Sequence, residues 1–106
     1  MTGVIINTTF FIPEGKERGL KIWLRDRFIP AAMAAGFTAP HFMQVTTNVQ
    51  PGMAVFALHL SHDSADAADA WLHGEGASVI GTEAELHGED FLWIHSTLIP
   101  LDEEVL

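Results

Sequence analysis

The sequence HFMQVTTNVQPGMAVFALHLS (residues 41–61) contains two strands and the turn between them, and it decides the fold that we predict. Segments 41–49 and 53–61 are rich in β-branched and aromatic residues, a composition typical of strands. Between them, Gln50-Pro51-Gly52 is a turn signal. The stretch therefore predicts an antiparallel hairpin in the middle of the chain.

Two further strands are expected near the ends of the chain. VIINTTFFI (4–12) is β-branched and aromatic, and it lies between Gly3 and Pro13. FLWIHSTLI (91–99) has a similar composition and ends at Pro100. Both segments read as strands that bracket the central hairpin.

A helical segment is expected between the first strand and the hairpin. It runs from Pro13-Glu14 to about Ala35, and Gly36 supplies a glycine termination. Pro30 cannot donate a hydrogen bond to the carbonyl of Asp26 and restricts the residue before it. We therefore expect a kink at 28–30 or two consecutive helices.

A second helical segment is expected after the hairpin, over residues 64–73, with Ser61 or Asp63 as its cap. The following segment, 74–87, contains several glycines, so we expect a weaker and broken helix there.

The resulting order is β-α-β-β-α-β, which predicts an α+β, ferredoxin-like domain spanning residues 1–106. Right-handed connections give a four-stranded antiparallel sheet of order 4-1-3-2 with both helices on one face. The other face of the sheet is bare in a single copy of the chain.

Composition limits the possible partners. The net charge is −9, which argues against nucleic acid because phosphate contacts need several cationic side chains. The chain has no cysteine, no apolar run of the ~18 residues that a bilayer span needs, and no signal peptide at its start. We expect a soluble cytoplasmic protein that binds neither nucleic acid nor membrane.

All five lysine and arginine residues lie in KERGLKIWLRDR (16–27). At helical spacing, Arg18, Lys21 and Arg25 form a stripe beside the apolar face. The stripe is a solvated surface, a docking site for an acidic partner, which could be a second copy, or an anion site, although no glycine-rich nest accompanies it. Arg27 falls inside the apolar arc, so we expect it to reach solvent or to form an ion pair.

Strand alternation assigns side chains to the bare face of the sheet. One register places there Asn7, Thr9, Phe11, Phe42, Gln44, Thr46, Val55, Ala57, His59, Trp93, His95 and Thr97. A register shifted by one residue would move the members of a strand to the opposite face.

Within this set, the candidates for lining a small-ligand pocket are Asn7, Thr9, Phe11, Gln44, His59, Trp93 and His95. His59 and His95 are also the acid–base candidates, because imidazole titrates near neutral pH. The alternative is that both histidines are structural, either satisfied at an interface or exposed at strand ends.

No motif indicates a metal or a cofactor. The histidines do not form an H-x-x-x-H or H-E-x-x-H pattern, and the chain has no phosphate loop, dinucleotide fingerprint or nucleophile elbow. The sequence therefore predicts no metal site and no cofactor.

Several short motifs occur in a characteristic order: INTTF (6–10), I-P (29–30), and Trp71 followed by Gly76-Ala77. In this order and spacing the chain resembles a family of short proteins known as a domain of unknown function. The resemblance covers nearly the whole chain and implies a ferredoxin-like fold similar to that of the dimeric α+β barrel proteins. It carries no catalytic residue over to this sequence.

Three functions are compatible with these observations. The first is a homodimer whose bare sheet face serves association, small-ligand binding, or both. The second is an enzyme resembling the cofactor-independent monooxygenases and isomerases of the dimeric barrel group. The third is a module that binds a protein partner through Arg18, Lys21 and Arg25.

Overall fold

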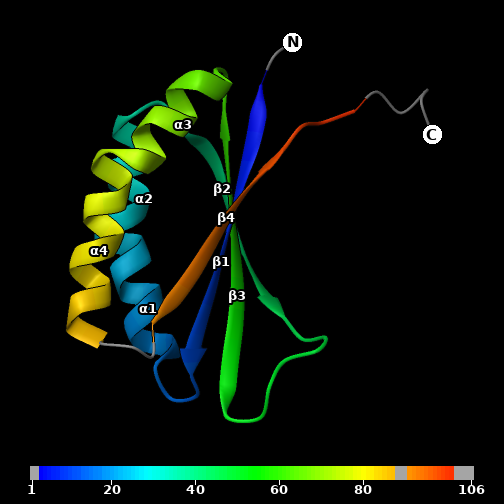
Figure 1. Ribbon diagram of the computed structural model, residues 1–106, viewed down its shortest axis with the longest axis vertical. Coiled ribbons are helices and arrows are strands. Elements are labelled where there is room, and N and C mark those ends of the chain that lie inside the picture. Colours follow the sequence, from blue (N-terminus) through cyan, green and yellow to red (C-terminus); the bar gives the residue numbers. More distant parts are fainter. Residues whose placement is uncertain (1–2, 88–90, 102–106) are drawn as a thin grey trace.

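The computed structural model describes residues 3–87 and 91–101 of the chain (Figure 1). The strands are β1 (Val4–Pro13), β2 (Thr38–Val45), β3 (Met53–His62) and β4 (Leu92–Leu98). The helical elements are α1 (Glu17–Trp23), the π-helical turn η1 (Leu24–Phe28), α2 (Ile29–Ala34), α3 (Ala65–His73) and α4 (Glu75–His87).

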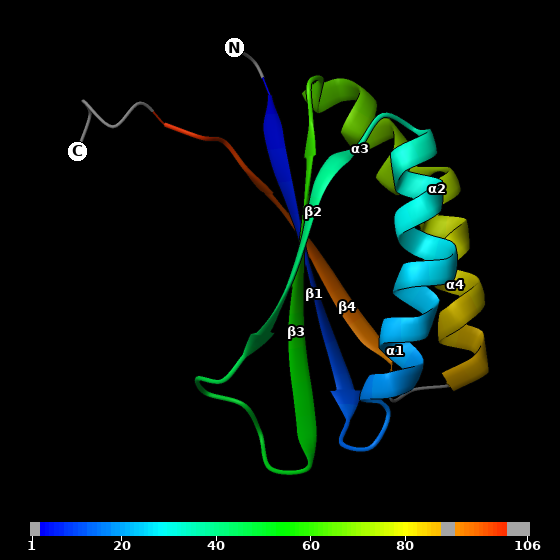
Figure 2. The same cartoon turned by 180° about the vertical axis from the view of Figure 1, so that it is seen from behind.

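The four strands form one sheet of order β2-β3-β1-β4, and every neighbouring pair is antiparallel. The helices all lie on one side of this sheet, and none of the helices or strands described in residues 3–87 and 91–101 covers the other side (Figures 1 and 2). This is the ferredoxin-like arrangement that the sequence predicted. Within the described residues, no helix combines the length and apolar character that crossing a bilayer requires.

The first helical segment has a π turn at Leu24–Phe28, directly before Ile29-Pro30, where a kink or two consecutive helices were expected. Its helix begins at Glu17, later than the predicted start at Pro13-Glu14. The N–H of Ile29 donates to the carbonyl of Leu24, a five-residue bond that defines a π turn. A π turn moves the preceding carbonyls relative to an α-helix, so the ring of Pro30 fits without interrupting the segment.

The second helical segment has a break at a single residue. Ser64 caps α3, and its hydroxyl accepts a hydrogen bond of 3.1 Å from the N–H of Ala67. The prediction that Ser61 or Asp63 is the cap was wrong. Gly74 has non-helical angles, φ −110° and ψ −109°, and α4 starts directly after it. The stretch 74–87, where a weak and broken helix was expected, is therefore a separate helix, and it is continuous from Glu75 to His87.

An aromatic cluster fills the space between the sheet and the helices. Phe10 of β1 is fully buried, and its ring centroid lies 6.0 Å from Trp23, 6.5 Å from Phe28 and 6.0 Å from Phe91. The even-numbered residues of β1 are all buried and the odd-numbered ones only partly so. The helix side of the sheet is therefore the core, and the alternation of β1 assigns the opposite side chains to solvent.

His62 links the end of α2 to the start of α3. Its Nε2 donates to the carbonyl of Ala35 at 3.1 Å, and its Nδ1 accepts from the N–H of Ser64 at 3.0 Å. Gly36 makes room for this ring: it has φ +97°, and a Cβ there would lie 3.0 Å from the His62 Nε2. Both ring nitrogens of His62 are thus used in holding two helices together.

The pairing of Trp71 with Gly76 has a steric origin. Trp71 packs between Phe28 and Phe37, with ring centroids 5.6 and 5.2 Å away. A Cβ on Gly76 would approach two carbons of the Trp71 ring to 2.7 Å. Glycine is needed here because α4 crosses directly over the indole.

We predict opposite effects for two glycine substitutions in α4. Gly76→Ala should lower the free energy of unfolding by about 1–3 kcal/mol, because its methyl group overpacks the Trp71 ring. Gly81→Ala meets nothing within 4 Å and should raise stability by about 0.5–1 kcal/mol through helix propensity. Urea unfolding of both variants tests this, and equal effects at the two positions would contradict it.

Candidate functional site

The side of the sheet that the helices leave uncovered is the candidate site, and we call it the open face. Its members follow from strand alternation and from the observed register. They are Ile5, Asn7, Thr9, Phe11 and Pro13 of β1, His41, Met43 and Val45 of β2, Met53, Val55, Ala57, His59 and Ser61 of β3, and Leu92, Ile94, Ser96 and Leu98 of β4.

A row of polar side chains crosses the open face. His41 of β2 lies directly opposite His59 of β3. His59 lies opposite Asn7 of β1, and Asn7 lies opposite Ser96 of β4. The register of four strands thus brings together residues that are far apart in the sequence, and we call them the polar row.

The amide of Asn7 has unused hydrogen-bonding capacity. Its Nδ2 donates to the Thr9 hydroxyl at 3.2 Å. Its Oδ1 is shielded from solvent and has no hydrogen-bond partner. An unpaired buried carbonyl oxygen is costly, so a donor that reaches the Asn7 oxygen gains a favourable hydrogen bond. His59 lies directly opposite Asn7 on the neighbouring strand.

Mostly apolar side chains lie beside the polar row, and Thr9 and Ser61 are the polar exceptions. One neighbouring row consists of Met43, Ala57, Thr9 and Ile94, and the next of Val45, Val55, Phe11 and Leu92. Four large side chains of the open face are substantially exposed: Met43 at 41%, Leu92 at 57%, Ile94 at 57% and Leu98 at 41%. None of the residues assigned above to the open face is Asp, Glu, Lys or Arg.

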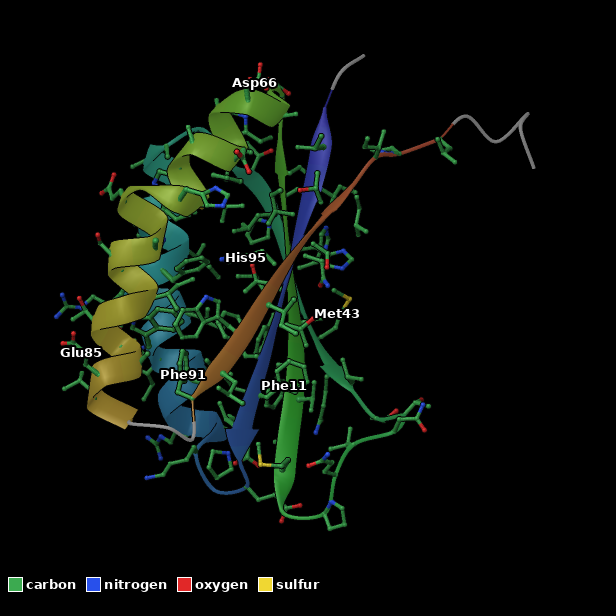
Figure 3. The ribbon with its side chains drawn as sticks, in the orientation of Figure 1. Phe11, Met43, Asp66, Glu85, Phe91 and His95 are labelled. Atoms are coloured by element: carbon green, nitrogen blue, oxygen red, sulfur yellow. The ribbon has the colours of Figure 1, made fainter. Side chains whose placement is uncertain are left out.

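Three predicted pocket residues lie on the helix side of the sheet, so their predicted placement was wrong. Gln44 pairs with buried Phe56, Trp93 pairs with buried Phe10, and His95 pairs with buried Thr8. Figure 3 shows Phe91 and His95 between the sheet and the helices, and Met43 on the opposite side. Phe42 and Thr97 also lie on the helix side, because they pair with buried Leu58 and Ile6. Thr46 lies beyond the end of β2.

The physical reason is that the inward–outward alternation of both edge strands, β2 and β4, is shifted by one residue from the predicted alternation. In β2 the register shifts between Thr38 and His41, and Phe42 stacks on Phe56 with ring centroids 5.1 Å apart. In β4 Trp93 packs against Phe91 at 5.7 Å. Aromatic burial therefore turns Phe42 and Trp93 inward, and it turns His41, Ile94 and Ser96 outward.

The two acid–base candidates consequently occupy different environments. His59 is half-buried on the open face. His95 is half-buried on the helix side, where its Nδ1 lies 2.8 Å from the hydroxyl of Thr8, a buried polar side chain of the core. Burial lowers the pKa of His95, and the nearby His73 lowers it further. The sheet separates the two imidazoles, so they cannot act on one substrate.

Each residue of the basic stripe lies exposed on α1 or η1. The ammonium of Lys21 sits 5.9 Å from the centroid of the Phe56 ring. Arg25 forms an ion pair of 2.8 Å with its neighbour Asp26, which lowers the pKa of that carboxyl group and raises the pKa of the guanidinium. Lys21 therefore already lies near the Phe56 ring, and Arg25 is paired with Asp26. Arg18 lies one helical turn before Lys21 in α1.

A separate groove of about 430 Å³ lies between the first helical segment and α4. Trp23, Arg27 and Glu83 are among the residues that line it. Arg27 is exposed, so its guanidinium reaches solvent as one of the two outcomes expected for it. The groove contains none of the residues that the sequence singled out for a ligand site.

Sequence reasoning missed two members of the polar row, His41 and Ser96. Both residues can be assigned to the open face only from the register of the edge strands, and no local sequence pattern indicates that register. Among the residues that the structure describes, no group of three or more histidine, cysteine, aspartate or glutamate side chains is placed to hold a metal ion.

Comparison with known proteins identifies the fold and a family. The family model of Domain of unknown function (DUF4286) matches residues 3–100. A Bacillus cereus protein described as an antibiotic biosynthesis monooxygenase superposes with a TM-score of 0.61 at 16% identity, over 97% of this chain and 98% of its own. The de novo designed protein Foldit4 superposes with a TM-score of 0.58 at 12% identity, over 93% and 99%. No curated protein matches the sequence.

These likenesses confirm the ferredoxin-like fold and the resemblance that the sequence motifs suggested. At such low identity they carry no activity over to this chain. The designed protein makes this point directly, because it shares the fold without an evolved function.

We predict that His95 makes stability depend on pH. Its lowered pKa means that the folded protein favours neutral imidazole, whereas the unfolded chain binds a proton below about pH 6.5. The free energy of unfolding should therefore be highest above that pH and should fall as the pH is lowered toward the pKa of the folded state. Urea unfolding at pH 7.5, 6.5 and 5.5 measures this, and His95→Gln should flatten the dependence.

A direct control is the titration of the His95 ring followed by NMR. A midpoint above the ordinary histidine value, or an unchanged pH dependence in His95→Gln, would contradict the prediction.

Proposed function

The chain belongs to the DUF4286 family, a domain of unknown function, and we propose that it works as a homodimer joined through the open face. In this proposal the two sheets face each other and enclose a small-ligand site around the polar row. The observation that carries the proposal is a sheet face that is apolar, exposed and free of charged side chains.

Exposed apolar area supports the association. The exposed apolar side chains of the open face lie on both edge strands of the sheet: Met43, Leu92, Ile94 and Leu98. Soluble monomers seldom expose a continuous apolar patch of more than a few hundred Å², and larger patches mark interfaces. A second copy would remove this surface from water and supply the second layer that the open face lacks.

Charge favours a second copy over other occupants. The chain carries a net charge of −9, so two copies repel each other over most orientations. Contact through the open face places no carboxylate against another, because the face has none. A two-fold interface uses the same patch on both copies, and an uncharged patch is complementary to itself.

The polar row gives the enclosed face a place for a ligand. Small-ligand sites are mostly apolar with a few convergent polar groups, which matches a polar row between apolar rows. The proposed lining keeps Asn7, Thr9, Phe11 and His59 from the sequence prediction and adds His41 and Ser96. Gln44, Trp93 and His95 drop out because the sheet separates them from this surface.

We predict that a single charge on the open face breaks the dimer. Ile94→Asp places two carboxylates in the proposed interface, where like charges cost several kcal/mol, so the dissociation constant should rise by roughly 100-fold or more. Leu86→Asp is the matched control: Leu86 is 77% exposed on α4, and the same change there leaves the open face intact. Light scattering and sedimentation at micromolar concentration measure both variants.

A monomeric parent protein at micromolar concentration would overturn the proposal. So would an Ile94→Asp variant that remains dimeric, or a Leu86→Asp variant that dissociates to the same extent.

A further inference from the structure

We infer that His41 and His59 bind a divalent transition-metal ion such as Zn²⁺ on the open face, with Asn7 as a positioning residue. This inference rests on the proposed function, because it names the ligand class of the site that the second copy would cover. Nothing in the sequence pairs these histidines, since they lie 18 positions apart on different strands.

The register supplies the geometry for two nitrogen ligands. His41 and His59 are direct partners in an antiparallel pair, and both lie on the same face. Side chains directly opposite each other have Cβ atoms about 4.5–5.5 Å apart. Two imidazoles at this separation can reach one ion at the Zn–N distance of about 2.0–2.1 Å.

Asn7 can fix the orientation of the His59 ring. It lies opposite His59 on the strand pair β1–β3, and its Oδ1 is shielded from solvent without a partner. A histidine that binds a metal through one ring nitrogen usually donates the other N–H to an oxygen acceptor. The Asn7 oxygen is an unused acceptor opposite His59, and in our proposal it accepts this N–H, which leaves the second nitrogen of His59 for the ion.

The charge distribution favours a cation on this face. All the lysine and arginine residues belong to residues 16–27, on the helix side of the sheet. A chain of net charge −9 attracts cations, and none of the residues assigned to the open face is a lysine or arginine that would repel the ion. Imidazole ligands suit Zn²⁺, Cu²⁺ and Ni²⁺, whereas Mg²⁺ and Ca²⁺ prefer oxygen.

Two imidazoles leave part of a tetrahedral coordination sphere open. Among the described residues no third histidine, cysteine or carboxylate joins the pair. In a single copy these positions would be left to solvent. In the proposed dimer the open face of the second copy lies over them, so the imidazoles of that copy are the groups that can complete the sphere.

Zn²⁺ titrated into the full chain by isothermal titration calorimetry tests the inference. His41→Gln and His59→Gln should each weaken binding by at least about tenfold, and Asn7→Ala by about 10–100-fold. Asn7→Asp should restore affinity, because a carboxylate oxygen can also accept the ring N–H. With Cu²⁺ as a spectroscopic probe, nitrogen hyperfine splitting from imidazole should disappear in the double variant His41→Gln/His59→Gln.

The matched control is His73→Gln, which removes an exposed imidazole of α3 on the other side of the sheet. Its affinity for Zn²⁺ should equal that of the parent protein. Unchanged binding in the double variant, or an equal loss in His73→Gln, would overturn the inference and indicate adventitious histidine binding. Circular dichroism confirms that each variant is folded, and all substituted positions tested for loss lie on the surface of the sheet away from the core.

Light scattering with EDTA and with added Zn²⁺ separates this inference from the dimer itself. A dimer that binds no Zn²⁺ at His41 and His59 overturns the metal site alone. A monomer that binds Zn²⁺ through both histidines overturns the dimer and keeps the metal pair.

Discussion

The burial of Phe10 against Trp23, Phe28 and Phe91 is the interaction on which the rest of this structure depends. It fixes which face of β1 meets the helices, and in a strand with a period of two this choice also fixes the other face. Asn7, Thr9 and Phe11 must therefore point away from the helices. Because β1 pairs with both β3 and β4, its orientation passes to its neighbours through the register. The core thus determines the composition of the open face.

This dependence explains how much the sequence could predict. The element order, the strand order and the faces of β1 and β3 were predicted correctly, because VIINTTFFI and MAVFALHLS are central strands joined to clear turn signals. For the two edge strands, β2 and β4, the predicted alternation of side chains was wrong by one residue. In β4, Leu92, Trp93 and Ile94 are all apolar, so alternation alone does not say which of them is buried. In β2, the register shift between Thr38 and His41 accompanies a positive φ of 53° at Ala39, a conformation that alanine rarely adopts.

The family motifs explain the fold and say little about chemistry. Ile29-Pro30 follows the π turn that accommodates the proline ring, and Gly76 leaves the space that the Trp71 indole occupies. Both are solutions to packing problems in the helical layer. The polar row contains only one residue of these motifs, Asn7 of INTTF. A search for chemistry guided by the motifs alone would therefore look at the core and pass over His41 and His59.

The segregation of charge connects the fold to the proposed site. The first helical segment holds every lysine and arginine, and its packing keeps these residues on the helix side of the sheet. The open face is left with imidazoles as its ionisable groups, next to an amide oxygen that has no partner. In the proposed dimer, a face without Asp, Glu, Lys or Arg lets two acidic copies approach, and in the proposed metal site the same face offers imidazole nitrogens within a chain of net charge −9. The proposed association and the proposed cation binding thus depend on a single arrangement, in which one sheet separates the cationic side chains from the histidine pair.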